Sequence, residues 1–185
     1  MTTETADDYQ NPEIIPRYSK EGYHLGKIPF DLFYDIQHWY DTNKDRIEPE
    51  PANIEWFYNT DVLYLTEELK NRLDDRIRPM VKEWVKEEVQ LSGIYGMRIY
   101  RNGAWLKNHF DRPGHILSGI LNIDQDVDED WPIFMENPDG QLDPHYLEPG
   151  DLMLYESQLV HGRETPLKGR GYANIFVHYR PSSWN

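Results

Sequence analysis

The feature that most constrains the fold is a series of short apolar or alternating runs in the second half of the chain. After Gly93 these runs follow one another closely, and Asn-Gly, Pro-Gly and Asp-Gly turn signals lie between them. Strands punctuated in this way are typical of an antiparallel sandwich or barrel. No strand–helix–strand rhythm is present, which argues against a doubly wound parallel sheet. The runs cover residues 94–100, 104–110, 116–123, 131–135, 151–155 and 172–179.

The first half of the chain has a different pattern. Apolar residues recur at three- and four-residue steps over 29–43 and again over 66–89, the period of an amphipathic helix. Pro79 interrupts the second stripe, so a kink or break is expected near Arg78. Residues 53–58 predict a short strand. We expect the helices to cover one face of a sheet.

Length and charge limit the classes of function. A chain of 185 residues suits a single domain. The formal net charge of −14 repels phosphate backbones and anionic lipids, so nucleic acid and membrane surfaces are poor partners. The chain has no cysteine, and its first twenty residues lack the order of a signal peptide. We expect a cytoplasmic protein, and the sequence leaves the oligomeric state open.

Three residues are candidate metal ligands. His109 and Asp111 are two residues apart, so in a strand their side chains project to the same face. His161 follows fifty residues later. Two imidazoles and one carboxylate form the facial triad of non-haem Fe(II) oxygenases. A His-x-Asp pair alone is common by chance, and each residue taken singly is more often structural.

The residues that surround these three candidates strengthen the prediction of a metal site. A Tyr100-x2-Gly103-x2-Leu106-x2-His109-x-Asp111 run is followed by Pro-Gly-Asp at 149–151, by His-Gly at 161–162 and by a basic residue near the last strand. This order resembles the 2-oxoglutarate and Fe(II)-dependent dioxygenases, most closely their prolyl 4-hydroxylase-like branch, over about residues 93–181. The resemblance implies a mainly β, double-stranded β-helix (jelly roll) core. The expected organisation is a flexible tail over 1–22, a helical buttress over 23–92 and a catalytic core over 93–181.

The resemblance also implies roles for individual residues. His109, Asp111 and His161 become the iron ligands. Arg170, nine residues after the distal histidine, becomes the partner of the distal carboxylate of 2-oxoglutarate, because a guanidinium binds carboxylates through a planar fork. Lys168 is the reserve candidate for this role and Arg163 a weaker one. Tyr100 matches a tyrosine that hydrogen-bonds the same carboxylate in relatives.

The implied reaction is hydroxylation of an unactivated C–H bond with release of succinate and CO₂. Its cofactors are Fe(II), 2-oxoglutarate as co-substrate and O₂, and ascorbate can serve as a reductant. Asp111 favours hydroxylation, because related halogenases have a small residue at that position. Further candidates for supporting the site or contacting substrate are Ser118, Asn122, Trp105, Trp131 and His115.

Peptidyl proline is the leading substrate. One alternative keeps every site residue and hydroxylates a free amino acid or another small molecule. A second alternative is a metal-binding, cupin-like module that does not use 2-oxoglutarate.

Overall fold

The computed structural model describes residues 17–51, 56–111 and 114–184. Its helices are α1 (Phe30–Thr42) and α2 (Glu67–Val85), with a short 3-10 helix η2 (Lys44–Arg46). The strands are β1 (Tyr23–Lys27), β2 (Glu48–Pro49), β3 (Phe57–Leu63), β4 (Val89–His109), β5 (Leu117–Val127), β6 (Ile133–Glu136), β7 (Leu142–His145), β8 (Asp151–Glu156), β9 (His161–Arg163) and β10 (Gly169–Pro181).

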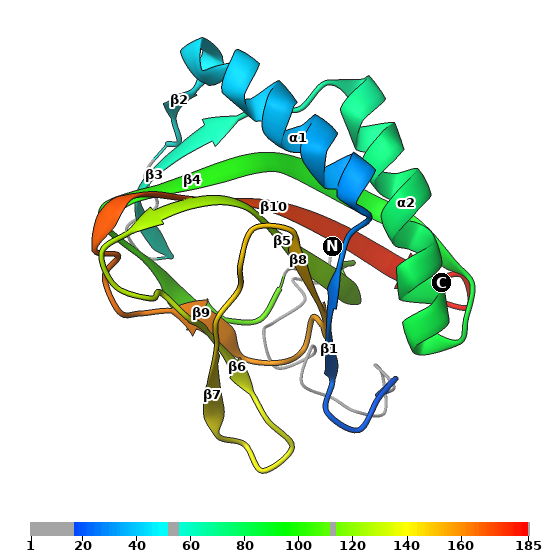
Figure 1. Ribbon diagram of the computed structural model, residues 1–185. Helices are drawn as coiled ribbons and strands as arrows, with labels where there is room; N and C mark the ends of the chain where they lie inside the picture. Colours follow the sequence, from blue (N-terminus) through cyan, green and yellow to red (C-terminus); the bar gives the residue numbers. More distant parts are fainter. Residues whose placement is uncertain (1–16, 52–55, 112–113, 185) are drawn as a thin grey trace, which may run out of the picture.

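The strands form one curled antiparallel sheet in the order β1-β8-β5-β10-β4-β9-β6-β7, and β3 joins the side of β4 and carries β2. In Figure 1 the sheet folds back on itself, so that β6, β7 and β9 lie below the long strands β4, β5 and β10. The predicted jelly roll, mainly β with helices, is confirmed.

Both helices cover the outer face of the long strands (Figure 1). Their apolar stripes are buried: Leu32 and Ile36 of α1 and Leu73 and Ile77 of α2 are each 0% exposed. They share one core with alternate residues of the strands beneath, such as Ile175 of β10. This face fixes the orientation of each strand, so the residues between these core positions project into the jelly roll. In the part of the chain that the structure describes, no helix is long and apolar enough to cross a membrane.

Several element boundaries differ from the prediction. The runs 94–100 and 104–110 belong to one strand, β4, because Asn102-Gly103 makes no turn. Gly103 has a φ of 79°, and its amide donates to Leu167 O, so the irregular backbone is stabilised inside the strand. The second helix passes through Pro79 and ends at Val85. Lys86 then takes a left-handed conformation, and Val89 already belongs to β4.

Other strands were missed or displaced. β7 carries Pro144 and lacks an apolar pattern, and β9 has three residues, too few for a periodic signal. β1 and β2 add strands to the region predicted as a helical buttress. The strand predicted over 53–58 lies partly outside the described residues, and the observed strand is β3. Of the predicted tail, residues 1–16 lie outside the described part of the chain.

Candidate metal centre

The three predicted ligands meet where β4 ends beside β9. His109 is the last residue of β4 and pairs directly with His161, the first residue of β9. Gly162 allows this close approach, because a Cβ there would lie 2.5 Å from Asn108 Oδ1 and 2.8 Å from the Asn108 backbone N. Asp111 follows β4, and its amide donates to Ser157 O at 3.1 Å.

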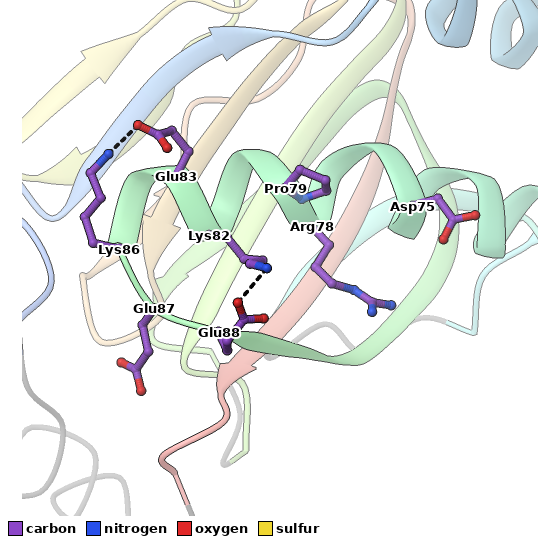
Figure 2. Close-up of a pocket in the computed structure, with 8 residues that line it drawn as sticks. All are labelled: Asp75, Arg78, Pro79, Lys82, Glu83, Lys86, Glu87 and Glu88. Atoms are coloured by element: carbon purple, nitrogen blue, oxygen red, sulfur yellow. Dashed lines mark hydrogen bonds and ion pairs between the residues drawn. The ribbon is translucent and has the colours of Figure 1, made fainter.

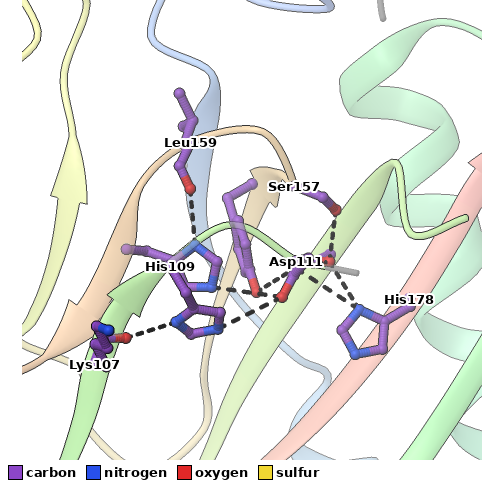
Figure 3. A network of polar contacts seen from close by, with 9 residues as sticks. Lys107, His109, Asp111, Ser157, Leu159 and His178 are labelled. Atoms are coloured by element: carbon purple, nitrogen blue, oxygen red, sulfur yellow. Dashed lines mark hydrogen bonds and ion pairs between the residues drawn. The ribbon is translucent and has the colours of Figure 1, made fainter. Parts of the chain in front are cut away.

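Each histidine is oriented by its own backbone surroundings (Figure 3). His109 Nδ1 lies 2.7 Å from Lys107 O, and His161 Nδ1 lies 2.9 Å from Leu159 O. A carbonyl oxygen can only accept a hydrogen bond, so these contacts favour the tautomer that carries its hydrogen on Nδ1 and has the lone pair for a metal on Nε2. Asp111 Oδ1 lies 4.0 Å from His109 Nε2 and 3.6 Å from His161 Nε2.

The geometry fits a small divalent cation. One ligand atom from each of the three residues lies within 4.8 Å of the other two. Two imidazole nitrogens and one carboxylate oxygen are the donors that Fe(II) accepts with positions left for exogenous ligands. These three residues could therefore hold Fe(II).

The second oxygen of Asp111 is held by hydroxyl groups. Ser118 Oγ donates to Oδ2 at 2.6 Å and Tyr155 OH donates at 2.9 Å. Ser118 Oγ also lies 2.8 Å from Ser157 Oγ and 2.8 Å from His178 Nδ1. With Oδ2 occupied by two donors, Oδ1 is the oxygen presented to the histidines, so Asp111 is arranged as a monodentate ligand.

Electrostatics keep His109 and Asp111 in the protonation states that suit metal binding. Burial and the adjacent His161 lower the pKa of His109 to about 4, so its imidazole is neutral at pH 7. Burial alone would raise the pKa of Asp111, but His161, His178 and the Ser118 hydroxyl hold it below its usual range. Burial and the Asp111 charge raise the pKa of Tyr155 well above its usual value, so the phenol stays a donor.

The residues predicted to surround the site divide into two groups. Ser118 contacts Asp111, and His115 stacks on His178 with ring centroids 4.0 Å apart. Tyr100 and Trp131 lie in a separate aromatic cluster with Tyr172.

The remaining two candidates lie on opposite faces of the sheet. Asn122 joins the aromatic cluster by donating from Nδ2 to Tyr172 OH at 3.1 Å. Trp105 is adjacent in β4 to Leu106, which belongs to that cluster, so strand alternation directs Trp105 to the other face.

Arg170, the predicted partner of the distal carboxylate of 2-oxoglutarate, has a side chain that faces solvent. Its side chain is 86% exposed and pairs with Asp126 at 2.5 Å. The cause is a β-bulge: Gly169 pairs with Val127 and Gly171 with Asp126, so Arg170 is the extra residue and is turned outward. The reserve candidate, Lys168, is also exposed and pairs with Glu129.

Sequence reasoning missed the support from Tyr155, Ser157 and His178. Arg163 was only a weak candidate for binding the distal carboxylate of 2-oxoglutarate, yet this residue is buried, with 1% of its surface exposed. Strand alternation could have predicted that Arg163 lies near the site, because it is two residues from His161 and projects to the same face of the strand.

A separate surface hollow of about 700 Å³ lies along the end of α2 (Figure 2). Its walls are charged side chains such as Arg78, Lys82 and Glu88. The metal ligands do not line it, so the hollow plays no part in the candidate centre.

Comparisons with protein-family models and with curated proteins gave no match. Solved structures do match. A prolyl-4-hydroxylase from Pseudomonas putida has a TM-score of 0.66 at 16% identity, over 91% of this chain and 97% of that one. A Trichoplax adhaerens prolyl hydroxylase, in complex with a hypoxia inducible factor peptide fragment, has a TM-score of 0.60 at 10% identity, over 96% and 94% of the two chains.

The non-heme alpha ketoglutarate dependent epimerase SnoN from nogalamycin biosynthesis has a TM-score of 0.71 at 12% identity, over 92% of this chain and 80% of that one. At these identities the likeness concerns the fold. The chain therefore has the fold of 2-oxoglutarate and Fe(II)-dependent oxygenases, including prolyl 4-hydroxylases, as its motifs predicted.

Proposed function

We propose that the protein is an Fe(II)- and 2-oxoglutarate-dependent dioxygenase that hydroxylates an unactivated C–H bond. The observation that carries the proposal is the convergence of His109, Asp111 and His161 within 4.8 Å on the fold these oxygenases share. Bound Fe(II) with 2-oxoglutarate and O₂ would supply the oxidising chemistry, with release of succinate and CO₂.

The chain's own residues bind and orient in this reaction. His109 and His161 present their Nε2 atoms, and Asp111 presents one carboxylate oxygen. Three protein ligands leave the rest of the coordination sphere for the co-substrate and O₂. Because Ser118 and Tyr155 both donate to Oδ2, the carboxylate stays ionised and fixed in direction.

Peptidyl proline is the proposed substrate. Two prolyl hydroxylases share the fold, and one of them is in complex with a peptide fragment. The His109 side chain is 18% exposed, and Trp56, 45% exposed, lies edge-on to it with ring centroids 6.1 Å apart. An exposed aromatic side chain beside a ligand suits contact with the ring of a prolyl residue.

A small-molecule substrate is the second candidate, because SnoN, with the same fold, comes from nogalamycin biosynthesis. The two are separated by incubating the protein with Fe(II), 2-oxoglutarate and air against prolyl peptides, free proline and other amino acids. Succinate and the gain of one oxygen by the substrate are measured by mass spectrometry. Oxygen gain by the peptides supports the proposal, and turnover confined to free amino acids or other small molecules overturns the peptide substrate.

A further inference from the structure

Two guanidinium groups, of buried Arg163 and partly buried Arg98, lie on the inner side of the jelly roll, and only one of them has a carboxylate partner among the described residues. Arg98 of β4 binds Glu50 through two hydrogen bonds, at 2.7 and 2.6 Å. Its charge is thus neutralised within the protein. Arg163 of β9 is the largest fully buried side chain, and no ion pair forms between it and the described part of the chain.

The surroundings of Arg163 hold the side chain without neutralising it. The guanidinium carbon lies 4.5 Å from the centroid of Trp131 and 4.6 Å from that of Tyr172. Nη1 donates to Trp131 O at 2.5 Å, whereas the buried Nη2 has no hydrogen-bond partner. A buried charge is costly unless it is paired, so this arrangement is built for an anion that comes from outside the chain.

The position of Arg163 relative to the candidate metal ligands indicates which anion it could bind. Arg163 and His161 are on the same face of β9, about 7 Å apart along the strand. A 2-oxo acid that chelates the metal beside His161 would reach Arg163 with a carboxylate at its far end. In 2-oxoglutarate two methylene groups separate the keto carbon from such a carboxylate.

We infer that Arg163, on β9, anchors the distal carboxylate of 2-oxoglutarate, in place of Arg170 on β10. Tyr100 and Trp131, which pack edge-to-face at 5.0 Å, form the adjoining wall of this subsite. Asn174 is buried on the inward face of β10, and neither polar atom of its side chain has a hydrogen-bond partner among the described residues. Its amide is therefore a further hydrogen-bonding group inside the jelly roll. This inference rests on the proposed function, because it assumes that 2-oxoglutarate binds at the metal.

Ligand truncation combined with mutation tests the inference. The Fe(II)-loaded protein is titrated anaerobically by calorimetry with 2-oxoglutarate and with 2-oxobutyrate, which lacks the distal carboxylate. Wild type is expected to prefer 2-oxoglutarate by roughly 30-fold or more, the usual effect of one buried charge pair. Arg163→Met should abolish this preference and leave 2-oxobutyrate affinity unchanged, whereas Arg170→Ala should keep it.

Controls separate anchoring from folding. Thermal unfolding of unliganded Arg163→Met should resemble that of wild type, because methionine keeps the stem and removes an unpaired charge. If that variant does not fold, Arg163→Lys replaces it. Loss of the planar guanidinium fork should lower the affinity for 2-oxoglutarate several-fold and leave the affinity for 2-oxobutyrate unchanged. An equal loss of affinity for both ligands would indicate a structural role of Arg163 and overturn the inference.

The remaining outcomes distinguish the two proposals. Loss of the preference in Arg170→Ala, with Arg163→Met unaffected, overturns the anchor assignment and leaves the proposed function standing. Wild type that binds Fe(II) but neither 2-oxo acid overturns both.

Discussion

His109 and His161 face each other directly across β4 and β9, with ring centroids 4.4 Å apart. Residues paired in this way on antiparallel strands have side chains within reach of one another. The ladder therefore sets the spacing of two candidate metal ligands, and the third candidate, Asp111, is added where β4 ends.

Gly162→Ala should disrupt this spacing. The new Cβ would press on the Asn108 backbone and force β9 away from β4. We expect metal affinity to fall about 10- to 100-fold and stability to fall by about 1–3 kcal/mol. Calorimetric titration with Mn(II) and urea unfolding measure the two effects. Gly93→Ala is the matched control, because a Cβ at Gly93 meets nothing within 4 Å; equal behaviour of the two variants would contradict the account.

Tyr155→Phe should weaken metal binding although Tyr155 is not a ligand. Its hydroxyl donates to Asp111 Oδ2, and removing a partner of a ligating group typically costs 10- to 100-fold in affinity. Tyr179→Phe provides the control, since Tyr179 is also fully buried in a strand but belongs to the core beneath the helices. Mn(II) titration should show a loss only for Tyr155→Phe; unchanged affinity would remove Tyr155 from the support of the site.

Asp111→Ala should abolish metal-dependent stabilisation. A metal at 100 times its dissociation constant stabilises the folded state by about 2.7 kcal/mol, so wild type should unfold at a higher temperature with Mn(II) and lose this gain with EDTA. Asp126→Ala, which removes an exposed carboxylate paired with Arg170, should behave as wild type. Stabilisation of Asp111→Ala by Mn(II) would show that the metal binds elsewhere.

Leu32→Ala should destabilise the protein by about 2–5 kcal/mol, because it leaves a cavity between α1 and the sheet. Phe30→Ala, in the same helix, removes a side chain that is 78% exposed and should change stability by less than about 0.5 kcal/mol. Urea unfolding compares the two. Similar losses would contradict the packing of α1 described here.

The clustering of the three candidate ligands could be predicted from the sequence because its signals are local or ordered along the chain. The two-residue spacing of His109 and Asp111 predicted that both side chains project to one side, and the surrounding motif pointed to His161. The orientation of Arg170 could not be predicted by counting residues. It depends on a bulge in which Gly169 approaches Asp126 and Val127, a contact between segments distant in sequence.

The two helices also differ in how well local sequence patterns predicted them. The apolar period predicted α1 closely, whereas a kink or break was expected near Pro79 and α2 continues through it without a break. The buried face of α2 on either side of Pro79, at Ile77 and Val81, packs on the sheet and keeps the helix continuous. Tertiary packing of this kind outweighs a local helix-breaking residue.

The most direct test of the account is the absorption spectrum of the Fe(II)-loaded protein under anaerobic conditions before and after addition of 2-oxoglutarate. Chelation of the metal by the 2-oxo acid is expected to produce a visible charge-transfer band in wild type and no band in Asp111→Ala. A wild-type protein that binds Fe(II) and shows no band with 2-oxoglutarate would contradict the proposed oxygenase function.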